Sequence, residues 1–269
     1  MRLVLAFIVL ASVALALTPY WLRPFPAYAV AVSPDGRALA ATPSGLLFFS
    51  KNGTVTGAIK GSFVWAGYSG QFVATGNGKV YIIGNVTREM VVPVQGPALL
   101  VGKELVVCGS SCYALTLEGK VLWKLDVPAS GSLAASDGKL YVPSYSYLLV
   151  VDLKSGKVLK KISAQELGGL ALSAASCGRL VAVSTTDSVA LVEGESVKWV
   201  NGKAWGYSVA FSPNCSKVAV TGGKALYLLS SSGSLLETVK LWKDFVSVSW
   251  EGSWVALGSP QGGVLVMSR

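Results

Sequence analysis

The residues that could carry out chemistry in this chain are carboxylates, cysteines and aromatic side chains, because its 269 residues include no histidine. Ser-His-Asp and Cys-His catalysis and histidine metal sites are therefore excluded. A carboxylate-based hydrolase needs two carboxylates roughly 5–10 Å apart. Asp187 and Asp244 are the candidate pair, and the competing interpretation is that both are exposed loop acids. Six other acidic residues resemble turn formers with solvated side chains: Asp35, Glu118, Asp137, Glu193, Glu195 and Glu251.

The four cysteines are an even number, which is typical of a disulfide framework in an oxidising compartment. Cys108 and Cys112 flank a three-residue turn between two predicted strands, so we expect them to be joined, with Cα atoms about 4.4–6.8 Å apart. Cys177 and Cys215 occupy the same turn of two consecutive repeats, and we expect a second disulfide there. The competing interpretation of that second pair is two small buried thiols. The spacing of the four cysteines does not fit a zinc site, so no metal is expected.

The first residues predict a targeting signal. Arg2 precedes an uncharged apolar stretch, and Ala14-Leu15-Ala16 fits a small-x-small cleavage pattern, so residues 1–16 are interpreted as a signal peptide. The alternative is a retained signal anchor that extends to about residue 22. Both interpretations place the folded part outside the cytoplasm, secreted or at the cell surface, with membrane contact only through that anchor.

Composition indicates a folded protein that does not bind nucleic acid. Apolar residues make up 52% of the chain and charged residues 14%, well below the usual share of about 25%. The net charge of +9 is spread along the chain, with no basic run longer than Lys160–Lys161. A nucleic-acid-binding surface would normally cluster its basic residues.

One unit of four short strands recurs seven times, and its second strand shows the repeat best. The second strands lie at 39–41, 73–75, 106–108, 141–143, 181–183, 218–220 and 255–257. The third strands keep the same spacing, at 46–49, 80–83, 113–116, 148–151, 189–192, 226–229 and 264–267. A four-stranded sheet of this size cannot bury both faces alone, but seven sheets packed around an axis can.

The predicted fold is therefore an all-β, seven-bladed β-propeller of four-stranded antiparallel blades over residues 29–269. The last unit ends without a fourth strand, which would leave an open sheet edge. Residues 17–28 are assigned to a closing strand and linker, and residues around Thr18 to Arg23 are expected to pair with the third strand of the seventh blade.

Short motifs then resemble known propeller repeats. Ala31-Val32-Ser33-Pro34-Asp35-Gly36 and Val209-Ala210-Phe211-Ser212-Pro213-Asn214 are similar to WD40 repeats, although the Gly-His and Trp-Asp pairs are absent. The segment 138–158 is similar to the YVTN repeats of prokaryotic surface-layer propellers, and the segment 117–123 resembles PQQ-like repeats. The resemblance implies an exported prokaryotic propeller used for binding. Few Asn and Gln and no His indicate a heat-adapted, archaeal source.

The two faces of such a propeller carry different residues. Three glycosylation sequons, at Asn52, Asn85 and Asn214, fall on the face of the first-to-second and third-to-fourth turns. The opposite face collects aromatic and polar loop residues, the usual material of a binding patch for sugars, peptides or acidic polymers. They are Lys60, Tyr145, Tyr147, Lys203, Trp205, Tyr207, Trp242, Lys243 and Gln261. The competing interpretation is that Trp205 and Trp242 are core residues wedged between blades.

Together these features predict a non-catalytic, extracytoplasmic binding or scaffold protein of the cell envelope. Its expected partner is a protein or a surface polysaccharide, with no cofactor and no nucleic acid. The alternative is an extracytoplasmic enzyme, either a carboxylate-based hydrolase or lyase or a PQQ-type quinoprotein, with its site at the channel mouth. An enzyme needs converging polar groups with perturbed pKa values in a deep pocket.

Overall fold

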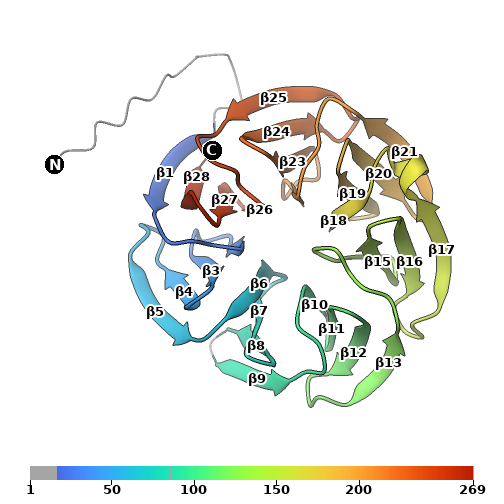
Figure 1. The fold of residues 1–269 in the computed structure, drawn as a ribbon, viewed down its shortest axis with the longest axis horizontal. Helices are drawn as coiled ribbons and strands as arrows, with labels where there is room; N and C mark the ends of the chain where they lie inside the picture. Colours follow the sequence, from blue (N-terminus) through green and yellow to red (C-terminus); the bar gives the residue numbers. More distant parts are fainter. Residues whose placement is uncertain (1–16, 85, 269) are drawn as a thin grey trace.

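A computed structural model describes residues 17–84 and 86–268. In this part of the chain, 28 strands form seven four-stranded sheets, which are arranged radially around a central axis (Figure 1). Every described strand pairing is antiparallel. The predicted seven-bladed propeller is confirmed.

Blades 1 to 6 run outward from the axis in chain order, and blade 7 takes its outermost strand from the N-terminal end of the described chain. Blade 1 consists of β2 (Ala29–Val32), β3 (Ala38–Thr42), β4 (Gly45–Phe49) and β5 (Val55–Lys60). Blade 2 consists of β6 (Phe63–Tyr68), β7 (Phe72–Gly76), β8 (Lys79–Ile83) and β9 (Thr87–Val91). Blade 3 consists of β10 (Ala98–Val101), β11 (Glu104–Cys108), β12 (Cys112–Thr116) and β13 (Val121–Leu125). Blades 4 and 5 consist of β14 (Ala134–Ser136), β15 (Lys139–Ser144), β16 (Tyr147–Asp152) and β17 (Val158–Ser163), and of β18 (Ala171–Cys177), β19 (Leu180–Thr185), β20 (Val189–Glu193) and β21 (Ser196–Asn201).

The ring continues through two more blades. Blade 6 consists of β22 (Ser208–Phe211), β23 (Lys217–Gly222), β24 (Ala225–Ser230) and β25 (Leu235–Lys240), and blade 7 of β26 (Ser247–Glu251), β27 (Trp254–Ser259), β28 (Gly263–Ser268) and β1 (Thr18–Arg23). A short helix, α1 (Ala164–Leu167), follows β17 and begins at a capping box formed by Ser163 and Glu166. No helix in the described residues is long and apolar enough to span a membrane.

The burial of each strand follows from its distance to the axis. The second strands are sandwiched between neighbouring blades, so they carry small and branched apolar residues on both faces; every residue of β3 is buried. The outer strand β5 alternates between exposed and half-buried positions because only one of its faces meets a neighbour. The hydrophobic effect thus acts mainly between blades rather than within them.

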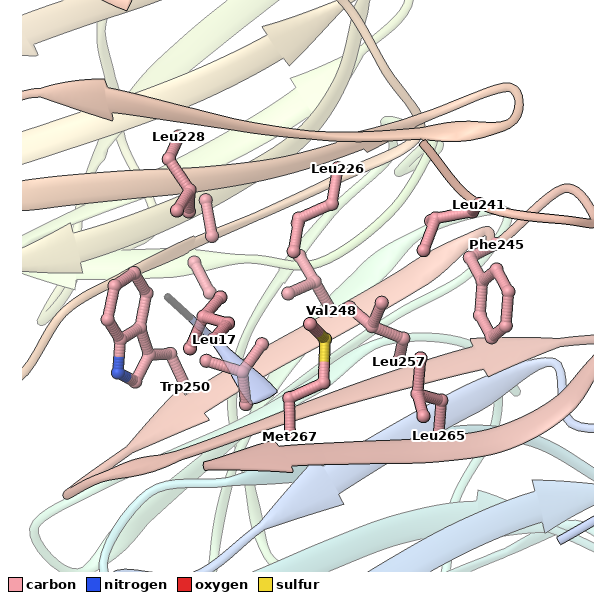
Figure 2. Packing of buried hydrophobic residues seen from close by; sticks show 13 residues of the cluster. Leu17, Leu226, Leu228, Leu241, Phe245, Val248, Trp250, Leu257, Leu265 and Met267 are labelled. Atoms are coloured by element: carbon pink, nitrogen blue, oxygen red, sulfur yellow. The ribbon is translucent and has the colours of Figure 1, made fainter. Parts of the chain in front are cut away.

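The interface of blades 6 and 7 shows this packing. Leu226 and Leu228 of β24 belong to one buried cluster with Val248, Trp250, Leu257 and Met267 of blade 7 (Figure 2). Leu17, the first described residue, is buried in the same cluster. The core is therefore a ring of interblade clusters around the axis.

The closing strand lies where the sequence predicts it. β1 pairs with β28 from Thr18 opposite Ser268 to Arg23 opposite Val264, with a bulge near Pro19. This pairing covers the edge that the last unit would otherwise expose. The predicted signal peptide, residues 1–16, lies outside the described residues.

Both predicted disulfides are present. Cys108 and Cys112 are directly paired across β11 and β12, and this cross-strand position brings their Cα atoms to 4.0 Å, slightly closer than the expected range. Cys177 and Cys215 have Cα atoms 5.5 Å apart and join blade 5 to blade 6. The second bridge is therefore a covalent link between neighbouring blades.

Three tryptophans on outermost strands fasten one blade to the next. Trp21, Trp123 and Trp199 each donate an indole N–H to a backbone carbonyl in the third-to-fourth turn of the following blade, at 2.8, 2.8 and 3.0 Å. Each ring lies against a glycine of that turn, which a Cβ atom would crowd: Gly53, Gly156 and Gly233. These three tryptophans therefore wedge between neighbouring blades at the outer edge of the ring.

Candidate binding face and axial cavity

A cavity of about 480 Å³ opens on the propeller axis, at the face where the blade-to-blade connections enter the inner strands. All seven blades contribute to its lining. The lining residues are Tyr28, Ala29, Val64, Trp65, Gln95, Gly96, Pro97, Ser130, Gly131, Ser132, Tyr145, Leu172, Ser173, Tyr207, Ser208, Val246 and Ser247. None of these is charged. A site of this size and concavity falls within the range typical of small-ligand pockets, about 300–1,000 Å³.

Four aromatic residues stand around this cavity. Tyr28, Tyr145 and Tyr207 are each about half exposed, so their rings are open to solvent. Trp65 reaches from blade 2 to blade 4, where its Nε1 donates a 3.3 Å hydrogen bond to Ser132 Oγ. The cavity therefore offers apolar ring faces to a ligand from several directions.

Serine hydroxyls supply the polar part of the lining. Ser208 Oγ accepts a hydrogen bond from the Val248 amide and Ser247 Oγ accepts one from the Val30 amide. Among the described residues, neither hydroxyl donates to a protein acceptor. Ser173 is 1% exposed and its Oγ has no hydrogen-bond partner in the described structure. Unpaired buried polar atoms are uncommon in folded proteins and invite an explanation.

Tyr145 has an unusual backbone conformation. It is the first residue of the two-residue turn between Ser144 and Tyr147, and its φ is +47°. A positive φ at this turn position favours glycine, and a side chain there costs about 1 kcal/mol or more. A bulky aromatic residue nevertheless occupies the position and lines the cavity. Such backbone strain is found preferentially at functional sites.

The residues predicted for the binding face lie in three settings. Tyr145 and Tyr207 line the cavity. Trp205 is half-buried and packs edge-on to Tyr207, with ring centroids 6.2 Å apart. Trp242 is 44% exposed and packs edge-on to Phe245. Tyr147 and the lysines at 203 and 243 are exposed outside the cavity, as are Lys60 and Gln261.

The burial of Trp205 and Trp242 does not fit the interpretation that they are core residues wedged between blades. Trp242 is too exposed to be a wedge between blades, and Trp205 is only partly covered. We call the set Tyr147, Lys203, Trp205, Trp242 and Lys243 the aromatic rim. The rim borders the face on which the cavity opens, because its residues lie on second-to-third turns and blade-to-blade connections.

Sequence reasoning missed Tyr28, Trp65, Gln95 and the serines of the cavity. These residues stand just before, or at the beginning of, the inner strand of their blades. The repeat contains part of the signal, because the beginning of each inner strand or the residues just before it supply lining residues in every blade. An alignment of the seven units on their inner strands would have collected them.

The acidic residues do not form the carboxylate pair that a hydrolase would need at the cavity, and one expected turn acid is partly buried. Asp187 and Asp244 lie in exposed loops and neither belongs to the cavity lining. Glu251, expected as a solvated turn acid, is instead half-buried at the far end of inner strand β26, so that assignment was wrong. Burial raises the pKa of its carboxyl from the ordinary 4.5 to about 7. Burial, followed by the charges of Glu251 and Asp35, also raises the pKa of Tyr68.

The sequons lie away from the cavity. Asn52 is exposed in the β4–β5 turn, where its Oδ1 accepts a hydrogen bond from the Tyr20 hydroxyl. Asn214 is exposed in the β22–β23 turn, beside the bridged Cys215. Asn85 lies outside the described residues. The described part of the chain holds no group of three or more side chains suited to a metal ion.

No family model matches this sequence, and no curated protein matches it either. Solved structures share its fold at low identity. BamB from Moraxella catarrhalis has a TM-score of 0.61 at 18% identity, over 90% of this chain and 85% of BamB. The WD40 β-propeller domain of Doa1 has a TM-score of 0.77 at 14% identity, over 94% and 97%. Virginiamycin B lyase from Staphylococcus aureus has a TM-score of 0.74 at 11% identity, over 92% and 96%. These similarities establish a seven-bladed β-propeller like those of WD40 domains.

Proposed function

We propose that this protein is an extracytoplasmic binding module of the cell envelope, which holds a protein partner on its aromatic rim and performs no chemistry itself. The observation that carries the proposal is the placement of Trp242 and Tyr147 on one face, each 44% exposed, with Lys203 and Lys243 on the same face. Exposed aromatic residues are enriched where proteins bind partners, and lysines around them would steer an acidic partner to the surface.

The acidic residues support binding over catalysis. A hydrolase of this fold would need paired carboxylates in a cleft, and Asp187 and Asp244 stand on exposed loops away from the cavity lining. Glu251, which has the most strongly raised carboxyl pKa, lies at the opposite end of an inner strand from Ser247, a lining residue. Propellers of similar fold include BamB and a WD40 domain, beside a lyase.

Export is supported by three features that agree. Residues 1–16 have the pattern of a signal peptide, both disulfides suit an oxidising compartment, and β1 begins two residues after the predicted cleavage position. Residues 18–23 form part of the ring, so they cannot at the same time cross a bilayer. Thr18 pairs with Ser268 at the end of β28 remote from the cavity, so any leader joins the propeller on the opposite face.

Site-specific photo-crosslinking in the organism that makes the protein tests the partner site. A photoreactive phenylalanine analogue is introduced at Tyr147 or Trp242, and the cross-linked products are resolved on denaturing gels and identified by mass spectrometry. We expect the same partner to be captured from both positions, because they lie on one face. Adding the Lys203→Glu and Lys243→Glu substitutions should reduce the yield, since the proposed surface is basic.

The matched control places the analogue at Leu236, which has the same 44% exposure as Trp242 but lies on outer strand β25. This position should give no product of the same mass. Equal capture from Leu236, or no capture from either rim position, would contradict a partner site on the rim.

A further inference from the structure

We propose that the axial cavity is a binding site for a neutral saccharide, separate from the aromatic rim and independent of the protein partner proposed above. The cavity is built on the propeller axis from residues of all seven blades, and no charged side chain is among the described residues that line it. The lining combines aromatic ring faces with hydroxyl groups, which complement the C–H faces and the hydroxyl groups of a sugar.

The absence of charge in the lining selects the ligand class. Phosphate, carboxylate or ammonium groups would be desolvated here without a partner of opposite charge, which is costly. A neutral sugar has no such charge. Its C–H faces can pack on Tyr28, Tyr145 and Tyr207, whose rings are half exposed at the mouth.

The polar groups of the lining have unused hydrogen-bonding capacity. Ser208 and Ser247 accept backbone N–H groups, and among the described residues their hydroxyl protons have no protein acceptor. Ser173 Oγ lacks any partner in the described structure. Sugar hydroxyls both donate and accept, so they can satisfy the hydroxyl groups of Ser208 and Ser247.

Tyr145 provides an independent sign that the cavity is built for a ligand. Its φ of +47° would suit glycine, and the tyrosine side chain is retained there as part of the cavity lining. Folding alone would be served better by a glycine. The strain is explained if the ring contributes a binding surface.

The test measures saturable binding of neutral sugars to the full exported chain. Glucose, galactose, mannose and N-acetylglucosamine, with their disaccharides, are screened by saturation-transfer NMR and titrated by calorimetry; glucuronic acid and glucosamine serve as charged counterparts. We expect at least one neutral sugar to bind and its charged counterpart to bind more weakly.

Two variants separate binding from folding. Tyr145→Gly removes the ring and relieves the backbone, and Tyr28→Ala removes a lining ring that is 45% exposed, so both should keep the thermal midpoint. Each should weaken sugar binding by about five- to tenfold, the loss expected for one stacking or hydrogen-bonding group. Trp242→Ala lies outside the cavity and should leave sugar affinity unchanged.

The outcomes distinguish this proposal from the proposed function. If no neutral sugar binds saturably, or if both cavity variants bind it with unchanged affinity, the saccharide site is refuted, whatever the rim captures. If no sugar binds but Tyr145→Gly abolishes cross-linking from Trp242, the cavity receives a peptide segment of the partner instead. Sugar binding without any rim cross-link supports the cavity site and contradicts the protein-docking rim.

Discussion

The indole of Trp123 on the outer strand of blade 3 lies against Gly156 in a turn of blade 4. Its Nε1 donates a 2.8 Å hydrogen bond to the Leu153 carbonyl, and a Cβ on Gly156 would lie 2.7 Å from the ring. Equivalent contacts of Trp21 and Trp199 fasten two other junctions. The ring of blades is thus held by specific outer contacts as well as by the interblade core.

This contact predicts that Gly156→Ala destabilises the fold through crowding. The matched control is Gly138→Ala in the same blade, because both glycines have a φ of +71° but nothing lies within 4 Å of a Cβ on Gly138. Both variants lose backbone freedom to a similar extent, and only Gly156→Ala collides with the tryptophan. Urea unfolding should show Gly156→Ala less stable than Gly138→Ala by about 1–3 kcal/mol. Equal stabilities of the two variants would mean that the Trp123 ring moves away from the new Cβ without loss of stability.

The two disulfides should differ in their contribution to stability. The Cys177–Cys215 bridge spans 38 residues and links two blades, whereas Cys108–Cys112 spans 4. By chain entropy, the Cys177→Ser, Cys215→Ser double variant should lose about 3–4 kcal/mol and the Cys108→Ser, Cys112→Ser variant about 2 kcal/mol. Denaturant unfolding without reductant compares the two. A larger loss for the short loop would refute the entropic explanation.

The raised pKa of Glu251 predicts that the stability of the fold depends on pH. Because burial raises its folded pKa from 4.5 to about 7, the folded state holds this proton more tightly than the unfolded state. Stability is therefore favoured below pH 4.5 and falls as the pH rises from 4.5 through 7. Glu251→Gln should remove this loss, so at pH 8 it should exceed the parent by about 1 kcal/mol, after allowance for solvent screening. At pH 4 the two should be nearly equal.

The proposed export predicts the N-terminus of the mature protein. Mass spectrometry of the protein recovered from the envelope or medium should show Leu17 as the first residue, because the small-x-small pattern ends at Ala16. Ala14→Leu with Ala16→Leu should leave the leader attached. Recovery of the parent chain with the full leader would instead favour a retained anchor.

Much of the fold follows from local patterns in the sequence. All seven predicted second strands lie within strands of the structure, from β3 to β27, because short continuous apolar runs bounded by turn residues define a buried strand locally. Cys177 and Cys215 could be paired because equivalent turns of consecutive repeats are neighbours in space. The closing strand β1 was predictable from an incomplete last repeat.

The candidate site depended on the closed ring. Tyr28, Trp65, Ser173 and Tyr207 come from four different blades, and only closure of the ring brings them to one cavity. The raised pKa of Glu251 and the docking of Trp123 on Gly156 likewise depend on which neighbour covers each residue. Strand formation and turn type are set by residues close in sequence, so the chain alone determined the repeat and its two disulfides. Burial at the axis and between blades is set by residues that are distant in sequence, so only the tertiary structure decided where the cavity lies and what lines it.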